Sequence, residues 1–85
     1  MRIELPLNDW VEVTPLDPLS TVHMQGELAA GFMYSQAESK PSHSDLGFAV
    51  YGDAIVRDRL AGAARLWVRA LPGTPNNGAV TVEVR

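Results

Sequence analysis

Short stretches in which apolar and polar residues alternate recur along the chain, and this is the pattern of half-buried β-strands. Gly, Pro, Asn and Asp separate these stretches, as is typical of an antiparallel sandwich or barrel. Eight strands are predicted in this way, over residues 2–5, 10–14, 21–25, 31–34, 46–51, 54–58, 64–71 and 79–84. The sequence therefore predicts an all-β fold, a small antiparallel β-sandwich of about eight short strands with jelly-roll or immunoglobulin-like strand order.

The last predicted strand has the clearest alternation of apolar and polar side chains. Its inward positions are expected to be Val80, Val82 and Val84, and its outward positions Ala79, Thr81, Glu83 and Arg85. In the second strand Val11 and Val13 share one face, and in the third strand Val22 and Met24 do so. These valines and the methionine are the candidate core.

Residues 55–71 also fit a second pattern. Apolar residues from Val56 to Leu71 recur at spacings of three and four, which is the pattern of an amphipathic helix. Gly62 in the middle of the segment and β-branched residues such as Val68 disfavour a helix. Two strands are therefore preferred here, and one helix is the alternative.

The segment 35–45 is polar, rich in serine and without periodicity. These features predict a long exposed loop between two strands. Loops of this length in a compact domain are usually functional or mobile.

A chain of 85 residues has room for one domain, so residues 1–85 are expected to form a single β-sandwich. Residues 1–8 alternate around Pro6 and are expected to form an edge strand of that sandwich; the alternative is an arm that lies on a neighbouring subunit. A domain of this size buries only about 60% of its unfolded surface. Since the chain has no cysteine, stability from neighbouring subunits is expected as well.

Composition excludes several classes of function. A net charge of −3 gives no basic field for a phosphate backbone, so no nucleic-acid partner is expected. The lack of cysteine excludes disulfides, thiolate metal sites and thiol nucleophiles. The first residues carry Glu4 and Asp9 and no long apolar run, so neither a signal peptide nor a membrane segment is predicted. Synthesis in the cytoplasm is the expectation.

The residues capable of chemistry do not occur at a spacing that indicates a site. His23 and His43 lie far apart in the sequence and are expected to be surface histidines rather than metal ligands. Ser42, His43 and Asp45 are nearly adjacent in the predicted loop, where they cannot hold the geometry of a catalytic triad. No catalytic residue, cofactor site or metal site is therefore predicted.

Two tryptophans and two arginines are the candidates for a contact surface. On the predicted strand 64–71, Arg65, Trp67 and Arg69 would line the outer face, and Trp10 lies opposite the valines of its own strand. Aromatic residues and arginine are enriched at protein interfaces. The alternatives are ordinary packing of the aromatic rings and a platform for carbohydrate at Trp67.

Charge is divided unevenly along the chain. Residues 1–53 contain eight acids and two bases, a net charge of −6, whereas residues 54–85 contain two acids and five bases, a net charge of +3. One interpretation is pairing between strands within the domain. The other is that an acidic edge of one copy meets the basic strands of another, in a ring or a surface lattice.

Two stretches resemble a known family. The segments Asp9-Trp10-Val11-Glu12-Val13 and Arg65-Leu66-Trp67-Val68-Arg69-Ala70, followed by the valine-alternating last strand, resemble small decoration proteins of tailed-bacteriophage virions. The resemblance implies a compact β-sandwich that binds the outer capsid surface and stabilises the shell as a cement protein, often as a trimer. It implies the major capsid protein and copies of the chain itself as partners, the virion as location, and no catalytic residue or cofactor. Residues 28–36 depart from the family pattern, because they lack its dense Val and Thr alternation.

Three hypotheses follow. The first is a non-enzymatic capsid decoration protein, forming a homotrimer, with Trp10, Arg65, Trp67 and Arg69 as contact residues. The second is a carbohydrate- or receptor-binding β-sandwich module of a phage tail or a cell surface. The third, a small enzyme, would need a cofactor or metal for which the sequence offers no ligands.

Overall fold

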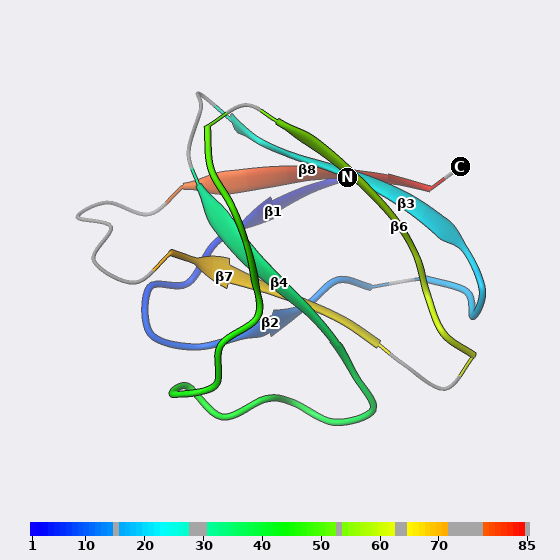
Figure 1. Ribbon diagram of the computed structural model, residues 1–85, viewed down its shortest axis with the longest axis horizontal. Helices are drawn as coiled ribbons and strands as arrows, with labels where there is room; N and C mark the ends of the chain where they lie inside the picture. Colours follow the sequence, from blue (N-terminus) through cyan, green and yellow to red (C-terminus); the bar gives the residue numbers. More distant parts are fainter. Residues whose placement is uncertain (15, 28–30, 53, 63–64, 72–77, 85) are drawn as a thin grey trace.

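The computed structural model describes residues 1–14, 16–27, 31–52, 54–62, 65–71 and 78–84. These residues form two four-stranded antiparallel sheets and no α-helix, so the predicted all-β sandwich is confirmed (Figure 1). The strands are β1 (Arg2–Glu4), β2 (Val11–Glu12), β3 (Thr21–Gly26), β4 (Phe32–Ala37), β5 (Phe48–Val50), β6 (Ile55–Arg59), β7 (Arg65–Ala70) and β8 (Ala79–Val84). No helix within the described ranges is long and apolar enough to cross a bilayer.

The order of the strands is that of a jelly roll. One sheet has the order β1-β8-β3-β6 and the other β2-β7-β4-β5. Each strand of the first half pairs with its mirror strand in the second half: β1 with β8, β2 with β7, β3 with β6 and β4 with β5. The chain therefore resembles one long hairpin that is rolled up, with β3–β8 and β4–β7 pairs completing the two sheets. This order decides between the two topologies that the sequence left open.

The main core lies between the two sheets. Its largest fully buried side chains are Leu5, Val13, Val22, Met24, Phe32, Leu66, Val68, Val80 and Val82. Each buried side chain of this size contributes about 1.5–3 kcal/mol relative to exposure. The inward positions predicted for β3 and for the middle of β8 are thus confirmed.

The ends of β8 differ from the prediction. Val84 is 51% exposed because it is the last residue of its strand, whereas Ala79 is only 2% exposed. Ala79 lies opposite Glu4 in the register, and so short a side chain is covered by its longer neighbours. Arg85 and residues 72–77 of the predicted turn lie outside the described residues.

The structure decides the alternatives for residues 55–71 and for the N-terminal residues, and it extends one strand beyond its predicted end. The helix alternative for residues 55–71 fails, because β6 and β7 occupy that segment and belong to different sheets. β4 continues to Ala37, where a loop was predicted, because its ladder with β7 runs as far as the pair Ala37 and Arg65. Residues 2–4 form an edge strand of their own sheet, as preferred over an arm.

Candidate interaction site

The two stretches that carry the family resemblance pair with each other. β2 lies beside β7, with Val11 opposite Val68 and Glu12 opposite Trp67. Trp10, Met33 and Trp67 form a small buried cluster that is separate from the main core. Because Val68 faces the core and side chains alternate along a strand, this outer cluster lies on the outer face of the sheet β2-β7-β4-β5.

The predicted contact surface is largely covered. Trp67 and Arg69 do lie on the outer face of β7, but their exposed fractions are only 7% and 5%, and that of Trp10 is 2%. The expectation that these three residues are exposed is wrong, and among the four candidates only Arg65 is exposed. The reason is that the segment 38–47 folds over this face of the sheet, through the hydrogen bonds described next.

Arg69 is the centre of these contacts. Its Nη1 donates to the carbonyl of His43 at 2.6 Å, its Nη2 to the carbonyl of Leu7 at 2.8 Å and its Nε to the carbonyl of Ala70 at 3.2 Å. The guanidinium also lies 5.7 Å from the ring centre of Trp10, a cation–π distance. A planar guanidinium with several fixed donors suits this task, because it binds segments from three parts of the chain at once.

The two indole groups fix the same segment. Nε1 of Trp10 donates to the carbonyl of Ser42 at 3.0 Å, and Nε1 of Trp67 donates to the carbonyl of Ala37 at 3.1 Å. We call Trp10, Trp67 and Arg69 the clamp. Together they hold the segment 38–47 at its start and at its middle.

An ion pair adds to the clamp at the surface. Lys40 Nζ lies 2.8 Å from Oδ2 of Asp9, and the backbone N–H of Trp10 donates to the other carboxylate oxygen at 2.8 Å. The hydrogen bond from Lys40, followed by that from the Trp10 backbone, holds the pKa of the Asp9 carboxyl below its ordinary value. Both side chains are about half exposed, so the pair orients the loop more than it stabilises the fold.

The serine, histidine and acid of the loop have structural roles. Oδ2 of Asp45 accepts a hydrogen bond from the backbone N–H of Ser42 at 2.8 Å, which closes a tight turn. His43 contributes its backbone carbonyl to Arg69. The contacts of Ser42 and Asp45 are therefore those of a turn.

Beyond the clamp, the chain displays an unusual row of exposed apolar side chains. Leu46 is 81% exposed, Phe48 69% and Tyr51 73%. We call these three residues the apolar edge, since they lie on or beside β5, the edge strand of its sheet. Single exposed apolar residues are ordinary, but three of them within residues 46–51 make this edge a candidate interaction site.

A groove runs along the outer side of the apolar edge. It has a volume of about 380 Å³ and is lined by Met33, Leu46, Gly47, Ala49, Tyr51 and Leu71. Met33 joins this groove to the outer cluster, so the clamp and the groove share one face of the sheet. Sequence reasoning placed a strand here without singling out these residues, although residues 46–52 contain no charged side chain, which was the available signal.

At Gly47 the backbone of the loop lies close against the sheet. A Cβ added there would collide with the carbonyl oxygen of Tyr34 and would lie 2.8 Å from the Trp10 ring. We expect Gly47→Ala to lower the free energy of unfolding by about 1–3 kcal/mol, as overpacking does. Gly62→Ala is the matched control, because a Cβ there meets nothing within 4 Å. Urea titration of both variants checks this, and equal midpoints would contradict it.

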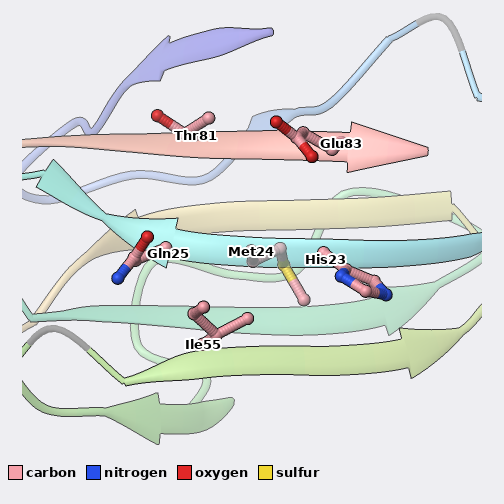
Figure 2. A pocket seen from close by; sticks show the side chains of 6 residues that line it. All are labelled: His23, Met24, Gln25, Ile55, Thr81 and Glu83. Carbon is pink, nitrogen blue, oxygen red and sulfur yellow. The ribbon is translucent and has the colours of Figure 1, made fainter. Parts of the chain in front are cut away.

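A second candidate site lies on the outer face of the other sheet. A shallow depression of about 120 Å³ lies there, and Figure 2 shows Gln25, His23, Thr81 and Glu83 on its neighbouring strands β3 and β8. His23 has Glu83 opposite it on one side and Arg57 on the other. The part of the chain that the structure describes contains no group of three His, Cys, Asp or Glu residues able to hold a metal ion.

Ion pairs within the molecule neutralise part of the charge difference between the two halves of the chain. Arg65 lies 3.8 Å from Glu12 and joins the two halves. The remaining ion pairs among the described residues, Arg2 with Glu4, Arg2 with Glu27 and Lys40 with Asp9, lie within the first half. Such exposed pairs are screened by solvent and contribute little to stability, so they do not determine the fold.

Tyr34 lies between the core and the apolar edge. Its hydroxyl makes the stability of the fold depend on pH in the alkaline range. Burial, and next the carboxylate of Asp58, raise the pKa of its hydroxyl above the ordinary value of 10.0. The folded state therefore holds this proton more tightly, and its stabilising effect is present below about pH 10 and lost as pH rises through the folded pKa. We expect Tyr34→Phe to flatten the fall of Tm between pH 9 and 11. A fall of equal steepness in both proteins would contradict this.

A scan against family models gives no match, and no curated protein or solved structure matches the chain. The function therefore has to be inferred from the residues and their arrangement, since a fold shared by many proteins does not identify one activity.

Proposed function

We propose that this chain is a non-enzymatic structural protein of a tailed-phage virion. It binds the outer surface of the capsid and stabilises the shell as a decoration protein. The observation that carries the proposal is the apolar edge, with Leu46 81% exposed, held in place by the buried clamp. A protein of this kind needs a fixed contact surface and no active site.

The clamp supports this proposal because of what it fixes. Loops that only connect strands are usually mobile and solvated. Here the side chains of Trp10, Trp67 and Arg69 are buried and hold the segment 38–47, and Leu46 lies exposed near the end of that segment. A surface that is ordered before it meets its partner loses less conformational entropy on binding.

The fold is compatible with the proposal without selecting it. Jelly rolls occur in viral capsid proteins, in lectins and in cupins. The resemblance of residues 9–13 and 65–70 to decoration proteins favours the first of these. The carbohydrate-binding alternative rested on exposed tryptophans, and Trp10 and Trp67 are both buried.

The size of the surface fits attachment in many copies. The three exposed side chains of the apolar edge amount to roughly half the area that a standard interface takes from each partner. One such contact is weak, but copies that repeat by symmetry on a shell attach firmly together. The partners proposed are accordingly the major capsid protein and copies of the chain itself; the trimer remains a prediction.

The proposal is tested by locating the chain in purified particles. Virions from cultures that carry the gene are banded in a density gradient, and the chain is quantified by mass spectrometry against the major capsid protein. We expect a copy number of the same order as that of the capsid protein. Absence from the particles, or a few copies per particle, would contradict a decoration role.

A further inference from the structure

We infer that two copies of this chain pair through β5, antiparallel and about a two-fold axis at Ala49, so that two sheets join edge to edge. This inference goes beyond the proposed function and does not depend on it. It concerns the free protein, and it names the partner as a second copy of the same chain. Because the pair covers the apolar edge, two paired copies would have to separate before that edge meets a capsid.

The first observation is that β5, a strand of three residues, is an open edge that carries no charge and no proline. Among the described residues β5 pairs with β4 on one side only. Edge strands are normally protected by charged residues or proline, which discourage the addition of another strand. Residues 46–52 contain neither, whereas the edge strand β6 carries Arg57 and Arg59 and would place like charges together in a two-fold pair.

The second observation is that this edge is complementary to itself. A two-fold axis at Ala49 places Phe48 of one copy opposite Val50 of the other, and Gly47 opposite Tyr51. Each large side chain thereby meets a smaller one.

The third observation is that the outer groove borders this edge. Ala49 and Tyr51 line it together with Met33 and Leu71. In the pair, the grooves of the two copies would adjoin each other across the axis.

On the opposite face, Phe48 already packs against Tyr34, with ring centres 5.5 Å apart. The pair would therefore extend both apolar layers across the axis. Because the area is about half that of a standard interface, we expect a dissociation constant roughly in the micromolar range, within reach of light scattering.

Single cysteines provide a sharp test, because the chain contains none. Residues directly opposite in an antiparallel pair have Cα atoms about 4.5–5.5 Å apart, which suits a disulfide. Ala49→Cys places its thiol on the axis. Tyr51→Cys, on the same edge, would lie about 14 Å from its own copy, and Val84→Cys, on the other sheet, leaves the edge intact.

The three variants are oxidised at equal concentration under mild conditions. We expect Ala49→Cys to form the disulfide dimer at least tenfold faster than Val84→Cys or Tyr51→Cys. We also expect the mass of the unmodified protein in light scattering to rise from one chain toward two with concentration, and Ala49→Arg to prevent this rise. Equal rates of crosslinking, or a mass of one chain throughout, would overturn the pair even if the chain is found in virions.

Discussion

Replacing Arg69 by alanine is expected to lower the free energy of unfolding by about 3–5 kcal/mol. The side chain is 5% exposed and donates to the carbonyls of Leu7 and His43, which would lose their donors in the variant. Its contact with the Trp10 ring would be lost as well. For a domain whose total stability is about 5–15 kcal/mol, this is a large fraction, and urea denaturation measures it.

Arg65→Ala is the control for this experiment. Arg65 lies on the same strand and the same face of the sheet, but its side chain is 59% exposed and, among the described residues, its ion pair is with Glu12 at 3.8 Å. Its loss is expected to cost no more than about 0.5 kcal/mol. Arg69→Lys keeps the charge but not the planar group of donors. Its free energy of unfolding should lie between those of the two alanine variants. If the two alanine variants were equally stable, Arg69 would not be the centre of the clamp.

Trp10→Ala has the second large effect that we expect, a loss of about 3–5 kcal/mol. The indole is 2% exposed and packs with Met33 and Trp67. It also lies directly against Gly47. Removing it leaves a cavity under the segment 38–47. Trp10→Phe keeps most of the packing but loses the hydrogen bond to Ser42, and should cost about 1–2 kcal/mol.

Hydrogen exchange distinguishes the clamp from ordinary core packing. In Trp10→Ala we expect the backbone N–H of Asp45, which donates to the carbonyl of Ser42, to lose protection before the strand β8 does. Loss of protection at the same rate across both regions would mean that Trp10 supports the whole fold and does not specifically hold the loop.

Alternation of apolar and polar residues was sufficient to predict the strands and the sandwich. It works here because Val22, Met24, Val80 and Val82 each face a single shared core. Residues between 55 and 71 fitted a helix as well, since short apolar runs satisfy both periods. Pairing with β3 and β4 decided in favour of strands, and such pairing is not visible locally.

The site was predicted less well, for a physical reason. Alternation gives the face of the sheet on which Trp67 and Arg69 lie, but it does not reveal a loop that covers that face. The covering contacts are distant in sequence: Arg69 with His43, 26 residues away, and Trp10 with Ser42, 32 residues away. Buried outer tryptophans and exposed ones therefore look alike in the sequence.

The apolar edge was missed for the opposite reason. Leu46, Phe48 and Tyr51 were assigned to a strand, and apolar residues of a strand are ordinarily taken as core. Their exposure follows from the position of β5 at the end of its sheet. An uncharged run on an unprotected edge is the feature that would have indicated it.

The central claim is that the chain works by attachment through the apolar edge, and binding to shells tests it most directly. Three purified proteins are each sedimented with tailed-phage shells that lack their decoration protein. They are the wild type, Leu46→Asp and Leu19→Asp. Leu46 is 81% exposed on the edge and Leu19 is 55% exposed away from it, so both variants should fold. We predict that wild type and Leu19→Asp bind alike, and that Leu46→Asp binds at least about tenfold more weakly, because a carboxylate would be desolvated in the contact. Failure of the wild-type protein to bind, or equal binding by all three, would contradict the account.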